Sequence, residues 1–186
     1  SGDLCSLHEG EDRPCLAVRM VLNDQGRKIG HHFVRALMRS AASLNYAQTQ
    51  AAADGTPDSQ TQPLLETVIR PLFAAYRAAQ KERAERQPLH LDLPERKIQL
   101  SPEGHVTSVS FQNRFDAHKL VEEFMILANV AAAQTLETKR VPFFYRVHEE
   151  PSVDKLDGLR DVAKAAGLVL AKGQVLKTAH LNKLLD

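Results

Sequence analysis

One run, Asn113–Arg140, constrains the fold of this chain more than any other stretch. Its apolar residues recur at helical spacing in two neighbouring stripes: Leu120, Phe124, Leu127 and Ala131, and Val121, Met125, Ala128 and Ala132. A helix that is apolar on all sides is normally buried. Asn113 or Asp116 can cap its start, and Pro142 stops it. The run predicts a long buried helix, about 37 Å in length. Its first turns hold the charged and polar side chains: His118, Lys119, Glu122 and Glu123.

The composition is that of an ordinary globular domain. The 186 residues suffice for one domain with a core, and 43% of them are hydrophobic and 25% charged. Because the net charge is only +1, nucleic-acid binding would have to come from local basic patches. Cys5 and Cys15 lack disulfide-framework or metal-ligand spacing. With no apolar run long enough to span a bilayer, we expect a cytoplasmic protein with reduced thiols and no membrane contact.

Two antiparallel hairpins are predicted from alternating apolar residues on either side of turn sequences. The turns are Asn23–Gly26 and Ser101–Gly104, each with a glycine able to adopt positive φ. The strands that they join are Leu16–Leu22 with Lys28–Arg39, and Leu89–Leu100 with Val106–Phe111. The expected fold class is α+β, with the antiparallel hairpins of one sheet packed against the long buried helix and flanking helices.

The flanking helices follow from apolar stripes and stop signals. They are Ser43–Ala53, a helix from Pro63 whose Lys81–Arg86 end is solvated charge, a helix from Ser152 to Ala166 capped by Gly167, and Ala179–Leu185. A short buried strand is predicted at Phe143–Val147.

The polar cluster at the start of the long helix has several interpretations. His118 and Glu122 share a helix face and could ligate a metal ion, but no third ligand is evident, so a structural hydrogen bond is favoured. Glu122 and Glu123 could be a pair for acid–base chemistry. The alternative is that one of them is solvated and the other caps a helix or pairs with an arginine.

A second candidate lies after the helix, where Arg146 and His148 alternate along the predicted strand. A basic pair at the end of a strand can contact phosphate, whereas the alternative is a buried pair between the arginine and a carboxylate. The residues taken alone therefore predict a soluble α+β domain with polar clusters, and no particular reaction.

The motifs themselves resemble those of a known family. RFDAHKLVEEFMILANVAAA is similar to the segment that ribonuclease II and ribonuclease R enzymes carry in their RNB catalytic domain. LCSL followed by Asp12-Arg13, the segment Ser43–Tyr46, Asp92–Glu95 (DLPE) and Tyr145–Glu149 with Pro151 resemble further family motifs in the same order. The resemblance is greatest to ribonuclease R-like bacterial enzymes and covers nearly the whole chain, more weakly after Leu168.

The resemblance implies part of an RNB-type fold and a processive 3′→5′ exoribonuclease that hydrolyses single-stranded RNA to nucleoside 5′-monophosphates. Such enzymes use Mg²⁺ at a cluster of aspartates, which in the family precedes the LCSL segment and is not found in this chain. We therefore expect residues 1–186 to be the central portion of one catalytic domain, truncated at both ends. The isolated chain should contain no catalytic or metal-binding residue and show no nuclease activity. The alternative is a non-catalytic relative that binds RNA or a partner.

The resemblance also implies that the protein contacts single-stranded RNA. We expect no obligate protein partner. Tyr46 and Glu122 match family residues placed near the riboses at the 3′ end, with Glu123 as the neighbouring alternative. A tyrosine hydroxyl and a carboxylate suit the 2′-hydroxyl, which both donates and accepts hydrogen bonds. The expected RNA-binding residues are Tyr46, Glu122, Glu123, Arg146 and His148.

Overall fold

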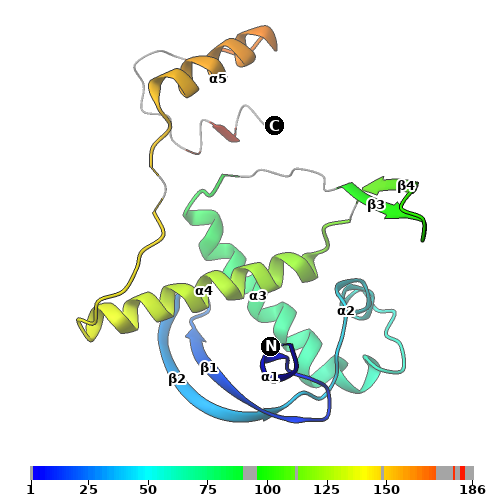
Figure 1. Ribbon diagram of the computed structural model, residues 1–186. Helices are drawn as coiled ribbons and strands as arrows, with labels where there is room; N and C mark the ends of the chain where they lie inside the picture. The colour runs from blue at the N-terminus through cyan, green and yellow to red at the C-terminus, as the bar shows by residue number, and fades with distance from the viewer. Residues whose placement is uncertain are drawn as a thin grey trace.

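A computed structural model describes residues 2–89, 96–111, 113–147, 149–170, 178, 181 and 182. Short helix α1 (Gly2–Cys5) precedes strands β1 (Asp12–Leu22) and β2 (Lys28–Arg39) and helix α2 (Tyr46–Ala53). The remaining elements are α3 (Arg70–Glu85), β3 (Arg96–Leu100), β4 (Val106–Phe111), α4 (Asp116–Thr138) and α5 (Val153–Ala165). The predicted α+β class is confirmed (Figure 1).

Helix α4 is the long helix expected from the sequence, but only one of its sides is buried. Its buried residues follow a single stripe: Ala117, Leu120, Glu123, Leu127 and Ala131. On the second apolar stripe, Val121 and Met125 are exposed, the latter by 60%. The prediction of a helix buried on all sides was therefore wrong, because α2, α3 and β1 pack against α4 from one side only.

The start of α4 also differs from the prediction. Its N-cap is Phe115, rather than Asn113 or Asp116. The backbone N–H of Phe115 donates to Nδ1 of His118 at 3.1 Å, so a histidine takes the place that Glu or Gln occupies in a usual capping box.

The segment that leads into α3 is helical but not regular. A 3₁₀ turn at Gln62–Leu64 is followed by a π-helical turn at Leu65–Ile69, in which the N–H of Arg70 donates to the carbonyl of Leu65. The wide turn lies just before Pro71, which has no N–H and whose ring would crowd the carbonyl four residues earlier in an α-helix. The wide turn removes this conflict and lets α3 continue to Glu85.

The main hydrophobic core lies where α2, α3 and α4 meet. Its buried residues come from all three helices and from the π-helical turn: Ala52, Leu65, Ile69, Phe73, Tyr76, Ala117 and Leu120. This core fixes the crossing of α3 and α4, from which the polar cluster projects.

The β1–β2 hairpin is attached to the helices at two places. Gly26, at φ +80°, lies so close to α3 that a Cβ atom would be 1.7 Å from the carbonyl oxygen of Ala78. Further along β2, His31 Nε2 lies 2.8 Å from Oγ1 of Thr135 and Lys28 Nζ donates to Gln134 at 2.7 Å, so that the strand is joined to α4.

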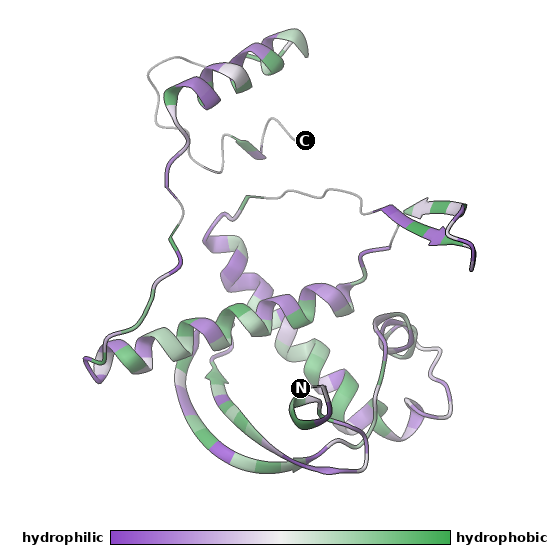
Figure 2. Cartoon of the chain, in the orientation of Figure 1, coloured by the Kyte–Doolittle hydropathy of each residue, from purple (hydrophilic) through white to green (hydrophobic). Residues whose placement is uncertain are grey.

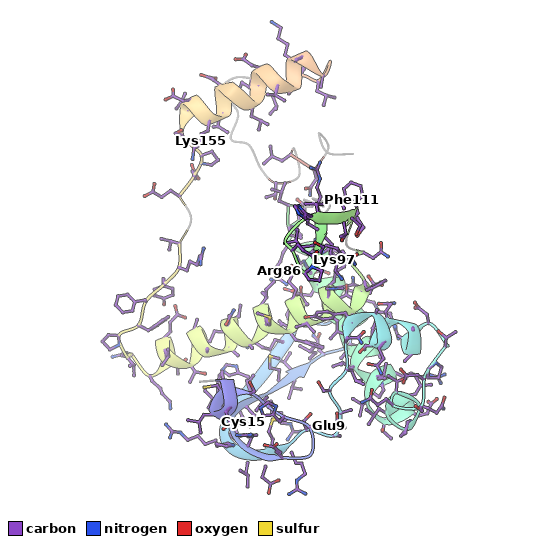
Figure 3. All side chains as sticks on the ribbon, turned by 45° about the vertical axis from the view of Figure 1, so that its right-hand side comes forward. Glu9, Cys15, Arg86, Lys97, Phe111 and Lys155 are labelled. Carbon is purple, nitrogen blue, oxygen red and sulfur yellow. The ribbon has the colours of Figure 1, made fainter. Side chains whose placement is uncertain are left out.

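The β3–β4 hairpin forms a two-stranded sheet of its own, so the expectation of one sheet was wrong. Every residue of both strands is exposed. Helix α4 lies between the two hairpins, with Lys97 and Phe111 of the second hairpin on the opposite side from Cys15 of β1 (Figures 1 and 3). The predicted strand from Leu89 begins at Arg96, and residues 90–95 lie outside the described residues.

After α4 the chain is extended and exposed, and the prediction of a buried strand at Phe143–Val147 was wrong. Phe144 is fully accessible to solvent. Helix α5 is confirmed, with Ser152 accepting from the N–H of Lys155 and Gly167 beyond its end. Most of the predicted helix Ala179–Leu185 lies outside the described residues, but Thr178 and Asn182 donate to the carbonyls of Gln87 and Pro88. Within the described ranges, no helix has the length and apolar character needed to cross a bilayer.

Candidate functional site

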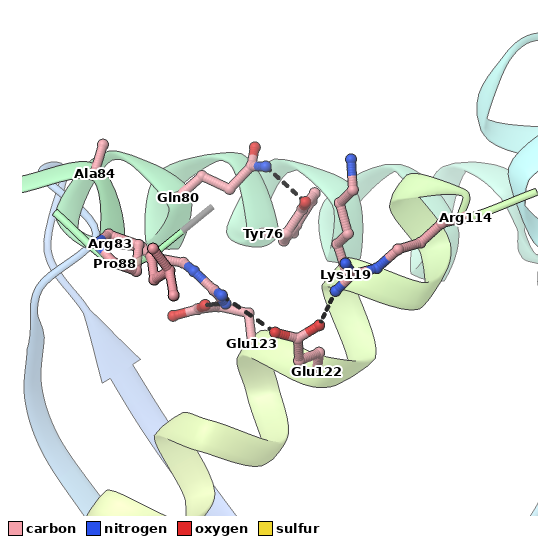
Figure 4. Close-up of a pocket in the computed structure, with 10 residues that line it drawn as sticks. Tyr76, Gln80, Arg83, Ala84, Pro88, Arg114, Lys119, Glu122 and Glu123 are labelled. Carbon is pink, nitrogen blue, oxygen red and sulfur yellow. Dashed lines mark hydrogen bonds and ion pairs between the residues drawn. The ribbon is translucent and has the colours of Figure 1, made fainter. Parts of the chain in front are cut away.

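A cavity of about 450 Å³, lined by several charged side chains, lies between the C-terminal half of α3 and the first turns of α4 (Figure 4). It is lined by Tyr76, Gln80, Arg83, Ala84, Pro88, Leu89, Arg114, Lys119, Glu122 and Glu123. Charged side chains from two helices thus meet at the crossing that the hydrophobic core fixes.

Glu123 is the buried centre of this cluster, with only 1% of its surface exposed. Its two carboxylate oxygens accept from different arginines, one from Arg83 of α3 at 2.7 Å and the other from Arg86, the C-cap residue of that helix, at 3.2 Å. A buried carboxylate is costly unless it is paired in this way. Of the interpretations left open by the sequence, the structure gives Glu123 the pairing with arginine.

Glu122 lies at the edge of the cavity, with 39% of its side chain exposed. It accepts from Arg83 at 3.1 Å and from Arg114 at 2.6 Å. Desolvation raises the pKa of Glu122, but the hydrogen bonds from Arg83 and Arg114 outweigh this effect and leave the pKa below its ordinary value. Its carboxylate is therefore ionised at neutral pH and held at the surface of the cavity.

Arg83 joins the two glutamates, because one of its terminal nitrogens contacts Glu123 and the other contacts Glu122. The hydrogen bond with Glu123 raises the pKa of Arg83 despite partial burial. The expectation that the Lys81–Arg86 end of α3 is solvated charge was therefore wrong for Arg83. A signal existed in the sequence, since Phe73, Tyr76 and Arg83 share one face of the helix.

Tyr76 extends this network into the hydrophobic core. Its hydroxyl accepts from Nε2 of Gln80 at 2.6 Å. Burial, together with the nearby charge of Asp116, raises the pKa of the Tyr76 hydroxyl. The phenol therefore stays protonated and neutral at physiological pH.

Tyr46 lies at the start of α2 and stacks on His118 of α4, with ring centroids 4.0 Å apart and planes 24° from parallel. His118 in turn lies 5.7 Å from the ring of Phe115. His118 and Glu122 are one helical turn apart on the same face of α4. The structure thus places Tyr46 against the first turn of α4, while Glu122 and Glu123 follow His118 by about one turn and line the cavity.

The chemistry of these donors does not fit a divalent cation. Glu122 and Glu123 already bind three arginines, whose positive charge opposes a metal ion, and Nδ1 of His118 accepts the N–H of Phe115. In the part of the chain that the structure describes, no group of three or more His, Cys, Asp and Glu side chains could hold one. His118 instead makes the structural hydrogen bond that the sequence favoured.

Of the second candidate pair, the structure describes only Arg146, which does not join this cluster. Arg146 is exposed in the extended segment between α4 and α5 and does not line the cavity. His148 lies outside the described residues.

Comparison with known proteins gives the family. The model of the RNB domain matches residues 1–186, so the chain belongs to the RNB domain family. It is 33% identical to ribonuclease R of Escherichia coli K12 over 188 residues, covering all of this chain and 23% of that protein. It is 34% identical to ribonuclease R of Vibrio parahaemolyticus over 175 residues, covering 93% of this chain and 21% of that protein. The chain thus spans about a quarter of the length of these relatives.

Solved structures show the same fold. Mycoplasma genitalium RNase R in complex with ribose-methylated single-stranded RNA superimposes with a TM-score of 0.87 at 20% identity, over 98% of this chain and 29% of that one. The complex of the same enzyme with double-stranded RNA gives 0.85 at 21% identity, over 98% of this chain and 33% of that one. The expected RNB-type fold is therefore confirmed.

Proposed function

We propose that this chain is part of a hydrolytic 3′→5′ exoribonuclease that degrades single-stranded RNA to nucleoside 5′-monophosphates. Membership of the RNB domain family and the similarity to ribonuclease R of Escherichia coli support this proposal. The Mycoplasma genitalium RNase R with the same fold binds single-stranded RNA. Within such an enzyme, the start of α4 would form part of the wall along which the RNA strand lies.

The observation that carries the proposal is the stacking of Tyr46 on His118, the residue that precedes Glu122 by one helical turn. Tyr46 stacks on His118, and Glu122 follows His118 by one turn on the same face of α4. The ring of a tyrosine and an ionised carboxylate thus lie one helical turn apart along α4. This combination suits a ribose, because its 2′-hydroxyl can donate to the carboxylate and accept from the phenol.

The two glutamates take different roles in this proposal. Glu122 is half-buried at the cavity and can meet a ligand, whereas Glu123 is inaccessible. We therefore assign the ribose contact to Glu122, and to Glu123 the role of holding Arg83, which binds Glu122 in turn. Arg146 is exposed and does not line the cavity. We propose Arg146 and His148 as contacts to the phosphate backbone of the RNA.

Cleavage in this proposal depends on Mg²⁺ bound by other residues of a longer cytoplasmic enzyme. The carboxylates of the described cluster do not fit the ion, and the chain covers 23% of the Escherichia coli relative. We therefore propose residues 1–186 as the central portion of a catalytic domain that is inactive when isolated. Mg²⁺-dependent release of mononucleotides from poly(A) by the purified chain would refute this.

Binding by fluorescence anisotropy tests the ribose contact. The 186-residue chain is titrated into labelled oligoadenylate RNA and DNA of equal length at fixed salt concentration, because phosphate contacts depend strongly on salt. We expect tighter binding of RNA. Tyr46→Ala and Glu122→Gln should each lower the RNA-to-DNA affinity ratio about tenfold, the value of one hydrogen bond to a charged or well-placed group.

Two variants control for the loss of an exposed aromatic ring and of a surface carboxylate. Phe111→Ala removes an exposed ring from β4, and Glu66→Gln removes one partner of an exposed ion pair with Arg70. Both should keep the ratio of the unmodified chain. Equal affinity of that chain for RNA and DNA would contradict the ribose contact. RNA binding without mononucleotide release by the full-length protein would favour the alternative of a non-catalytic RNA-binding relative.

A further inference from the structure

His118 is restrained on two sides although it does not line the cavity. Its Nδ1 accepts the N–H of Phe115 at 3.1 Å, which places the proton of the neutral ring on Nε2. Its ring plane lies 24° from that of Tyr46, at a centroid distance of 4.0 Å. One side chain therefore couples the first turn of α4 to an aromatic ring of α2.

The backbone beneath Tyr46 is already fixed by other contacts. Helix α2 has a full capping box, in which Asn45 and Gln48 bind each other's backbone N–H. Gln50 of α2 accepts the N–H of Ala117 at 3.0 Å, which ties this helix to the start of α4. The remaining freedom is the rotation of the Tyr46 side chain, which is 44% exposed, and the stacking on His118 restricts that rotation.

We propose that His118 is a positioning residue for RNA recognition, which holds the Tyr46 ring so that its hydroxyl and the Glu122 carboxylate face the same stretch of ribose. This inference rests on the proposed function, in which Tyr46 and Glu122 contact ribose. His118 lies between the two groups because it stacks on Tyr46 and precedes Glu122 by one turn on the same face of α4. We expect His118 to affect the discrimination between RNA and DNA and not the general affinity. RNA and DNA carry the same phosphates and differ at the 2′-hydroxyl, which is the group that Tyr46 and Glu122 would contact.

Two substitutions separate the hydrogen bond of His118 from its stacking. His118→Gln keeps an acceptor for the N–H of Phe115, because glutamine at this helix position is a normal capping-box partner, but it removes the ring. His118→Phe keeps a ring that can stack on Tyr46 and removes the acceptor. The pair thus tests whether stacking or capping determines recognition.

We expect His118→Gln to lower the RNA-to-DNA affinity ratio about two- to tenfold, the range given by the loss of one aromatic stacking contact. Its affinity for DNA and its unfolding midpoint should be unchanged. His118→Phe should keep the ratio and lower the unfolding midpoint. The ring protons of Tyr46, assigned by their loss in Tyr46→Phe, should shift in the NMR spectrum of His118→Gln and stay near their original positions in His118→Phe.

The outcomes distinguish this inference from the proposed function. If Tyr46→Ala lowers the ratio and His118→Gln does not, the ribose contact stands and the positioning role is wrong. If Tyr46→Ala leaves the ratio unchanged, the ribose contact is wrong and the inference falls with it. A loss of the ratio in His118→Phe but not in His118→Gln would overturn the inference, because capping of α4 and not stacking would then be the cause.

Discussion

The two hairpins of this chain have nearly the same turn and very different surroundings. In each turn the glycine N–H donates to the carbonyl three residues earlier, from Gly26 to Asn23 at 2.8 Å and from Gly104 to Ser101 at 2.9 Å. The side-chain oxygen of Asn23 or Ser101 accepts two further backbone N–H groups in each turn. Each hairpin also has a register irregularity beside its turn.

Their surroundings differ because only the first hairpin is covered by helices. Gly26 contacts α3, and β2 is bonded to α4 through His31 and Lys28. The second hairpin exposes its apolar residues, which include Ile98, Val109 and Phe111. Figure 2 shows hydrophobic positions on both of its strands. The same local turn can therefore be part of the packed body or stand outside it. Only the packed hairpin supports α4, which carries the candidate site.

Hydrogen exchange should show the largest difference. An isolated two-stranded hairpin is only marginally stable, so the β3–β4 amides should exchange almost as in an unfolded chain. The β1–β2 amides should open only with the whole structure and be protected at least about a thousandfold more strongly, if the chain is stable by about 5 kcal/mol. Exchange measured by NMR checks this, and equal protection of both hairpins would break the comparison.

Substitution of the two turn glycines is the matched test of packing. Gly26→Ala adds left-handed strain and a Cβ atom that would be 1.7 Å from the Ala78 carbonyl oxygen. Together these should cost about 3 kcal/mol, which lowers the thermal midpoint of a chain of this length by about 6 to 12 °C.

Gly104→Ala is the control, since Gly104 has a similar φ of +87° and no atom within 4 Å of the added Cβ. The left-handed strain of Gly104→Ala acts on the β3–β4 hairpin, which should unfold separately from the core. The thermal midpoint of the core should therefore stay unchanged. Equal shifts in the two variants, measured by thermal unfolding, would show that strain and not the contact with α3 dominates.

Acid unfolding should give the smallest effect. Because the folded-state pKa of Glu122 lies below its ordinary value of 4.5, its contribution to stability is present above about pH 4.5 and is lost as the pH falls through the lowered value. Between pH 5 and pH 3, the Glu122→Gln variant should therefore lose less stability than the unmodified chain. The difference between the two losses should be below about 1 kcal/mol, because the ion pairs of Glu122 are partly exposed.

The control for this prediction lies in the uncovered hairpin. A hydrogen bond from Ser101 also lowers the pKa of Glu103, but that carboxylate is fully exposed. Glu103→Gln should leave the acid dependence of the thermal midpoint unchanged. The same flattening of the pH profile in both variants would show that the ion cluster at α4 is not its source.

Much of the local structure could be predicted from the sequence. The turns, the return strand Lys28–Arg39, the long helix and α5 follow from turn residues, periodicity and stop signals within a few neighbouring positions. The family motifs also pointed to Tyr46 and Glu122. The prediction of a buried strand at Phe143–Val147 was wrong. Its apolar pattern specifies no partner strand, and none lies beside it in the described structure.

The sequence by itself determined where the helices and hairpins form, because caps, turns and apolar periodicity act over a few residues. The tertiary structure alone decided which stripe of α4 is buried, which hairpin is packed, and that Glu123 rather than Glu122 is buried among its arginine partners. Arg83 and Glu123 are 40 residues apart in the chain and meet only because the core makes α3 and α4 cross. The burial and pairing of a charge depend on such distant neighbours, which no local pattern specifies.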